Sequence, residues 1–197
     1  ERVYVSSDGV VEDFAGNVGS PAAMLMGWQG LAAPHPEDGF ESGAGVHLEG
    51  GALLAGAMGG VAPPEGAMAL WLPPGSLPLD VSPRWAVVRL DPPEGAARVG
   101  FVVHVVGGSR EVDPRERLEV ILLDGGGERA SLDLAARVAL EPTGHPELPF
   151  ASAPRRVSLA LAPSATPVYV VFRVESVACG QPAPGSHGLQ IDALRAE

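Results

Sequence analysis

The sequence predicts an all-β protein built as a two-sheet antiparallel sandwich. Short segments rich in Val, Leu and Ile alternate apolar and polar residues, which is the period of a β-strand. The 26 Gly and 20 Pro residues gather between these segments, where turns are expected. No segment shows a clear helical period. The length of 197 residues fits one domain of sandwich size, spanning residues 1–197.

Turn residues divide the chain into successive predicted strands. We expect strands at residues 2–6, 10–14, 45–54, 67–72, 85–90, 99–106, 118–123, 130–140, 156–162, 168–174 and 188–196. Gly50-Gly51 interrupts its segment, which predicts a hairpin or a bulge there. Residues 124–128 predict a hairpin turn, and residues 130–140 could also form a short helix. Residues 29–45 form a long irregular stretch.

The charge of the chain excludes two classes of partner. Asp and Glu number 24 against 13 basic residues, all of them Arg, so the net charge is −11. A surface of this sign repels the phosphates of nucleic acids and of anionic membranes. No apolar run reaches the roughly 18 residues that cross a bilayer. Cys179 is the single cysteine, which excludes a disulfide framework and a Cys-based metal site.

Two acids lie within apolar, strand-like segments near the ends of the chain. Glu12 lies in the second predicted strand and Asp192 in the last. A carboxylate in a sheet interior is costly unless it is paired or binds a metal. If the two end strands lie side by side, Glu12 and Asp192 can share a cation. The alternative is that Glu12 faces solvent or pairs with an Arg, and that Asp192 caps a turn.

Two strongly apolar segments predict one mixed face on a sheet. In residues 99–106 and 168–174 every second side chain is a large apolar one that we assign to the core. The residues between them then face outward on the same sheet, joined by two from residues 85–90. The candidates for ligand binding on this face are Trp85, Arg89, His104, Tyr169 and Arg173. Aromatic and polar groups together suit a sugar; the alternative is an ordinary, partly exposed sheet face.

The sequence contains no catalytic constellation. The five histidines are scattered, without a His-x-His pair, and there is no Gly-x-Ser-x-Gly motif. Gly107-Gly108-Ser109 follows a predicted strand but lacks the Lys of a phosphate-binding loop. We therefore predict that the protein is not an enzyme. A polysaccharide lyase or hydrolase is the least favoured interpretation.

The order of motifs resembles the galactose-binding-like, carbohydrate-binding-module family of jelly-roll β-sandwiches. Members of this family often open with Asn-Gly-x-Phe-Glu, continue with a Trp after a loop, and close with Asp-Asp between aliphatic residues. Residues 8–12 (Asp-Gly-Val-Val-Glu) stand in the opening position, Trp28 follows, and residues 190–194 (Gln-Ile-Asp-Ala-Leu) close the chain. The sequence departs from the pattern in Asp8, Val11 and Ala193.

A second match to the opening motif lies later in the chain. Residues 39–43 read Gly-Phe-Glu-Ser-Gly, but they come after Trp28, where the family order does not place them. We therefore interpret them as a loop. The resemblance implies a structural calcium ion held by the opening Glu and the closing Asp, which are Glu12 and Asp192 in this assignment. If residues 39–43 are the true opening, Glu41 replaces Glu12.

The resemblance also implies a function. We expect a non-catalytic module that binds carbohydrate or another cell-surface component, located extracellularly or at the cell surface as part of a larger exported protein. The alternative is a structural or adhesion module that binds protein partners and has no glycan site. The low aromatic content of 5% favours the alternative.

Overall fold

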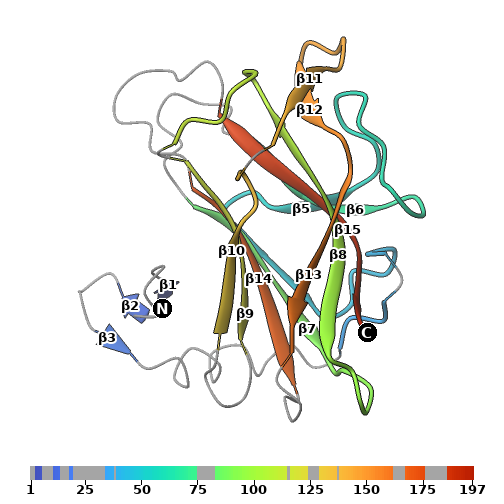
Figure 1. Cartoon of the computed structure of the whole chain (residues 1–197), viewed down its shortest axis with the longest axis vertical. Coiled ribbons are helices and arrows are strands. Elements are labelled where there is room, and N and C mark those ends of the chain that lie inside the picture. Colours follow the sequence, from blue (N-terminus) through green and yellow to red (C-terminus); the bar gives the residue numbers. More distant parts are fainter. Residues whose placement is uncertain are drawn as a thin grey trace.

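The structure of the protein is a computed structural model. It describes residues 3–5, 11–13, 18–19, 34–37, 39–74, 83–114, 116–123, 129–136, 138–161, 167–175 and 186–197, of which the first three ranges and residue 129 are described in their backbone alone. Figure 1 shows the chain, in which the described residues form strands, turns and loops and contain no helix. The described part accordingly has no long apolar helix that could cross a membrane.

The described strands follow the predicted segments closely. In chain order they are β1 (Val3–Val5), β2 (Val11–Asp13), β3 (Val18–Gly19), β4 (Val46–Glu49), β5 (Leu53–Ala55), β6 (Ala69–Leu72), β7 (Arg84–Leu90), β8 (Arg98–Gly107), β9 (Arg117–Leu123), β10 (Arg129–Asp133), β11 (Leu140–Pro142), β12 (Phe150–Ser152), β13 (Arg155–Ala160), β14 (Val168–Glu175) and β15 (His187–Ala196). The short strands β3, β11 and β12 were not predicted, because two or three residues are too few to show alternation.

Two antiparallel sheets pack face to face. One is five-stranded with the order β10-β9-β14-β7-β4, and the other is seven-stranded with the order β11-β12-β8-β15-β6-β5 and β13 also on β8. The chain crosses repeatedly from one sheet to the other, as in a jelly roll. Figure 1 shows the two layers crossing near the middle of the molecule. The predicted two-sheet antiparallel jelly-roll sandwich is confirmed.

Two local predictions are wrong. Gly50-Gly51 makes neither a hairpin nor a bulge, because β4 pairs with β7 in one sheet and β5 pairs with β6 in the other. The two glycines, both at positive φ, carry the chain between sheets. Residues 130–140 are neither one strand nor a helix: β10 ends at Asp133, a turn follows, and β11 begins at Leu140. By contrast, β9 and β10 are adjacent and antiparallel, as the predicted hairpin requires.

The expected pairing of the end strands does not occur. β2 pairs with β1 and β3 in a separate three-stranded sheet, whereas β15 lies between β8 and β6. The side chain of Glu12 is outside the described residues. The strands of Glu12 and Asp192 therefore do not pair with each other, although such pairing was the reason to expect a shared cation.

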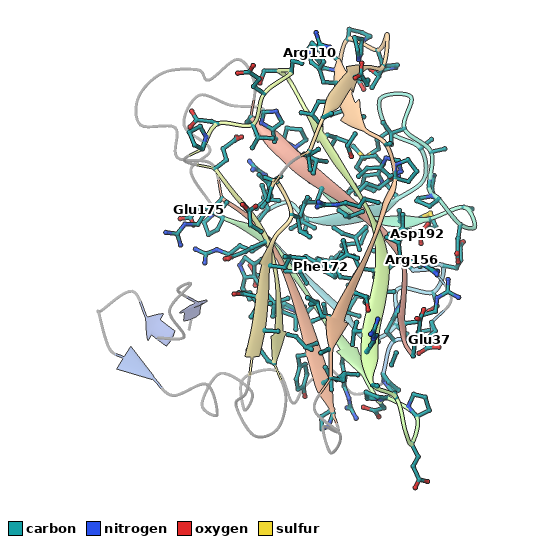
Figure 2. All side chains as sticks on the ribbon, in the orientation of Figure 1. Glu37, Arg110, Arg156, Phe172, Glu175 and Asp192 are labelled. Atoms are coloured by element: carbon teal, nitrogen blue, oxygen red, sulfur yellow. The ribbon has the colours of Figure 1, made fainter. Side chains whose placement is uncertain are left out.

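The core lies between the two sheets and consists of the inward-facing residues of both. Its largest contributors from the central strands are Phe101 on β8 and Phe172 on β14, whose rings meet edge to face with centroids 5.1 Å apart. Edge-to-face contact places the positive ring edge against the negative ring face. Figure 2 shows Phe172 in the middle of the sandwich. This contact joins the two layers at their centre.

We expect Phe172→Ala to destabilise the fold by about 3–5 kcal/mol, since it removes a fully buried ring and leaves a cavity between the sheets. Urea denaturation measures this loss. The exposed Ser131→Ala on β10 serves as control and should change the free energy of unfolding by less than about 0.5 kcal/mol. A loss below about 1 kcal/mol for Phe172→Ala would contradict the assignment of this ring to the core.

Candidate functional site

Four of the five ligand-binding candidates lie together on the outer face of the five-stranded sheet. The register of β7 and β14 places Trp85 opposite Arg173 and Arg89 opposite Tyr169. The residues that alternate with them belong to the core between the sheets, so these four side chains face the other way. The outer face of this sheet is therefore the first candidate for a binding site.

His104 does not belong to this face. It lies on β8, which pairs with β12, β13 and β15 in the seven-stranded sheet, and never with β14. The expectation that His104 shares a sheet with Tyr169 and Arg173 is wrong. Alternation along one strand shows which residues share a face of that strand, but it does not show which strands are neighbours.

One row of side chains crosses four strands at the Trp85 end of the face. Register places Glu49, Trp85, Arg173 and Glu119 side by side on β4, β7, β14 and β9. His47 flanks the row, with its ring centroid 5.8 Å from a ring of Trp85. We call these five residues, together with Glu175, the Trp85 surface. Figure 2 shows Glu175 at the outer side of the five-stranded sheet.

Arg173 is held rigidly within the Trp85 surface. Its Nη1 donates to Glu119 Oε1 at 3.2 Å and its Nη2 donates to Glu175 Oε2 at 2.7 Å. The Arg173 side chain is only 12% exposed, so these charge-assisted bonds are shielded from water. Trp85 beside it is half-buried. A planar cation in a fixed orientation next to a partly exposed indole can both stack on a ring and hydrogen-bond to hydroxyl groups.

The opposite end of the same face is closed to a ligand. Tyr169 is 3% exposed, and Val87, Ile121 and Val171 beside it are at most 2% exposed. Arg89 donates from Nε and Nη2 to the two oxygens of Asp91, at 3.1 and 3.0 Å. Tyr169 is thus too buried to contact a ligand, and Arg89 is 22% exposed but paired with Asp91. Trp85 and Arg173 are the candidates that lie in the polar row across four strands.

Asp192 is a fully buried carboxylate on β15. Its Oδ2 accepts the backbone N–H of Glu65 at 2.8 Å and its Oδ1 accepts that of Ala193 at 2.7 Å. The charges of Glu41 and Glu65 are near enough to act on it. Glu41 Oε1 in turn accepts the backbone N–H groups of Ala67 and Met68. The acids therefore lie around one turn, with Asp192 at the centre.

The backbone around Asp192 is strained. The non-glycine residues with positive φ in the described part of the chain are Glu37, Phe40 and Ala193, at 58°, 72° and 53°. Glu37 accepts the backbone N–H of Ala196. A Cβ atom added at Gly39 would lie only 3.2 Å from Asp192 Oδ1. Each left-handed non-glycine residue costs about 1–3 kcal/mol. Ala193 and the segment that contains Gly39 and Phe40 carry this cost beside the Asp192 carboxylate.

Burial raises the pKa of Asp192 above its ordinary value of 3.8, and the nearby charges of Glu65 and Glu41 raise it further, while the two backbone hydrogen bonds lower it. The described residues contain no group of three or more His, Cys, Asp or Glu side chains arranged to hold a metal. A cation here would therefore need backbone carbonyl oxygens in addition to carboxylates, which is a donor set that calcium accepts.

A second buried polar cluster lies at the start of β15. His187 is fully buried; its Nδ1 is 2.6 Å from Glu116 Oε2 and its Nε2 is 3.1 Å from the carbonyl oxygen of Ser109. Both ring nitrogens thus face acceptors. The Ser109 hydroxyl donates to the carbonyl of Glu111 at 2.8 Å, and its oxygen is also 3.5 Å from His187 Nε2. The cluster joins the loop after β8 to the last strand.

Sequence reasoning missed the roles of Glu116 and Gln190, and it gave Glu41 only as the alternative to Glu12. The Gly-Phe-Glu motif at residues 39–41 was a usable signal for Glu41, since Phe40 is fully buried in the core and Gly39 adjoins Asp192. Glu116 and Gln190 gave no signal, because their partners or neighbours are distant in the sequence.

Comparisons with known proteins show the fold. No family model matches the chain, and no curated protein matches it. Among solved structures, TmCBM61 in complex with β-1,4-galactotriose is 15% identical, with a TM-score of 0.50 over 83% of this chain and 97% of that one. The chain thus has a carbohydrate-binding-module-like β-sandwich fold. At this identity the likeness establishes the fold alone.

Two further solved structures are similar at lower TM-scores. CBM28, a carbohydrate-binding module specific for non-crystalline cellulose, is 9% identical, with a TM-score of 0.46 over 84% of this chain and 94% of that one. The K1 cleaved adhesin domain of Lys-gingipain from Porphyromonas gingivalis W83 is 10% identical, with a TM-score of 0.47 over 81% and 96% of the two chains.

We expect Asp192 to make the metal-free protein less stable as the pH rises. A carboxyl whose pKa is higher in the folded than in the unfolded state keeps its proton better when folded. Its contribution to the free energy of unfolding is therefore constant below pH 3.8, the ordinary pKa of Asp. This contribution is lost as the pH rises from there through the raised pKa of the folded state, by at most about 1.4 kcal/mol per pH unit. Urea denaturation with chelator, comparing wild type with Asp192→Asn between pH 3.5 and 7, isolates this term. A difference that grows in favour of the wild type at higher pH would contradict it.

Proposed function

We propose that the protein is a non-catalytic carbohydrate-binding module that takes a glycan on the Trp85 surface. The observation that carries this proposal is the row of Trp85 and Arg173 on rigid strands, with Arg173 bonded to two carboxylates. A half-buried indole offers an apolar face to a sugar ring, and the flanking acids and guanidinium offer fixed hydrogen-bond partners for hydroxyl groups. The fold, shared with TmCBM61, supports this assignment.

The geometry suits weak binding of a polymer. The Trp85 surface follows a row across the sheet and has a single indole, so one or two sugar units would occupy it. Affinity would then come from repetition, either of sites in a larger protein or of units in the glycan. A module of an exported protein that acts outside the cell or at its surface fits this mode of binding.

We further propose that a structural calcium ion binds at Asp192. Asp192 is a buried carboxylate, and the charges of Glu41 and Glu65 act on it. Asp192 and Glu41 are the side chains that would hold the ion, and backbone carbonyl oxygens would supply the remaining ligands. The ion would supply positive charge that offsets the burial of Asp192 and would fasten residues 37–41 to the last strand.

Affinity electrophoresis against soluble galactan, xylan and a cellulose derivative tests the glycan proposal. We expect at least one polysaccharide to retard the protein. Trp85→Ala should weaken binding at least tenfold, which corresponds to about 1.4 kcal/mol. Ser158→Ala, an exposed change on the other sheet, should leave the retardation unchanged. Equal retardation of wild type and Trp85→Ala, or none with any glycan, would count against the site and favour a protein-binding module.

Thermal unfolding at pH 7 with calcium or with chelator tests the ion. Binding to the folded state alone stabilises it by about 2.7 kcal/mol when calcium exceeds Kd a hundredfold. We expect Asp192→Ala and Glu41→Ala to abolish the calcium-dependent rise in Tm, whereas Glu12→Ala keeps it. Loss of the effect in Glu12→Ala but not in Glu41→Ala would restore the original assignment. Coincident curves together with a metal-free protein by elemental analysis would rule the ion out.

A further inference from the structure

A row of three polar or aromatic side chains lies on the outer face of the seven-stranded sheet. Gln190 on β15 is in direct register with Trp71 on β6 and with His104 on β8. The residues that alternate with them along these strands face the core, so the three side chains share the outer face. This face is on the opposite side of the sandwich from the Trp85 surface.

Gln190 is the unusual member of the row. It is fully buried, and neither its amide nitrogen nor its amide oxygen has a hydrogen-bond partner in the part of the chain that the structure describes. A primary amide offers two donors and an acceptor with two lone pairs. Burying all of them unsatisfied is costly, and an aliphatic side chain would fill the same position without that cost. The amide is therefore matched to a partner that the described part of the chain does not supply.

The neighbours of Gln190 define the chemistry of such a partner. His104 Nδ1 is 3.0 Å from the carbonyl oxygen of Ser152, which can only accept, so Nδ1 carries the hydrogen of this bond. Trp71 donates its indole N–H to the carbonyls of Ala55 and Gly56, which fixes the ring and leaves its apolar faces for packing. The row thus offers donors and acceptors without a net charge.

The layer over this face carries a second unsatisfied group. Trp71 packs with Val61 and Leu148, which come from the turn after β5 and from the loop between β11 and β12. His145 lies in the same loop, and its Nδ1 is also buried without a hydrogen-bond partner among the residues that the structure describes. His104 is half-buried, so the row approaches the surface on the β8 side. Two independent buried polar groups without partners therefore occur on one face of one sheet.

We propose that Trp71, Gln190 and His104 form a second ligand site, which takes a single uncharged, hydroxyl-bearing unit such as a polyol or one sugar residue. A hydroxyl group both donates and accepts, so neighbouring hydroxyls satisfy the amide nitrogen and oxygen of Gln190 and the Nε2 of His104 together. The row contains no Asp, Glu or Arg, so it carries no fixed charge that would select an ion. This site is separate from the Trp85 surface and does not depend on it.

The side-chain amide of Gln190 reports the binding directly. In ¹H–¹⁵N spectra, galactose, glucose and glycerol are titrated separately, and Gln190→Leu identifies the NH₂ signals of Gln190. We expect a saturable shift of these signals and of the Trp71 indole N–H with at least one of the three probes. The shift should persist in Trp85→Ala, which separates this site from the glycan surface, and in Ser158→Ala as a control.

Stability gives a second and independent readout. We expect Gln190→Leu to have a Tm equal to or above that of the wild type without probe, because it removes an unsatisfied amide, and to lose the probe-dependent rise in Tm. A Tm of Gln190→Leu well below the wild-type value would overturn the proposal. So would wild-type Gln190 signals that do not respond to any probe at concentrations up to tens of millimolar. Contacts of the Gln190 NH₂ to a resident water alone, with no response to the probes, would overturn it as well.

Discussion

The constraint on which much of this structure depends is that β15 is buried on both faces. Its inward residues complete the core, and its outward residues are covered as well, although several of them are polar. A polar group in that position must be hydrogen-bonded, and each is handled differently. His187 binds Glu116 and the backbone of Ser109, Asp192 binds two backbone N–H groups, and Gln190 has no partner among the described residues. The first two are thus satisfied within the protein, and Gln190 is the residue for which we propose a ligand.

The two outer faces of the sandwich differ in the kind of polarity they carry. The five-stranded sheet presents charges in pairs at its accessible end, where Arg173 lies between Glu119 and Glu175. The seven-stranded sheet presents neutral polar groups among apolar ones, beneath covering loops. Arg173 is only 12% exposed and is held by two carboxylates, so its orientation is fixed before any ligand binds. Neutral groups under a cover suit a small ligand held by complete hydrogen bonding.

Alternation in the sequence was sufficient to assign the faces of single strands. It placed Phe101, Phe172 and their neighbours in the core, and it put Trp85 and Arg173 on an outer face. It could not place His104, because membership of a sheet depends on pairing between strands that are far apart in the chain. The same limit explains the error at Gly50-Gly51, where a local turn signal did not reveal that the two flanking strands belong to different sheets.

Local sequence patterns also could not show which acid lies near Asp192. Glu12 and Glu41 each end a glycine-containing segment that resembles the opening motif of the family. The sequence alone does not show which of the two lies near Asp192, whereas the fold places Glu41 there. Phe40, which precedes Glu41, is fully buried in the core, and Glu41 binds the turn that also binds Asp192. Gln190 could not have been singled out at all, since a glutamine in an alternating segment normally faces water.

The position of β15 in the chain also governs how the molecule can be assembled. β15 lies between β8 and β6, yet it follows both of them and every other strand in the sequence. During synthesis on a ribosome, β8 and β6 must therefore wait with unpaired edges until residues 187–196 have emerged. The seven-stranded sheet is completed by the last of its strands to be made, so its closure is a late, long-range step, and until then the unpaired edges can pair with other strands.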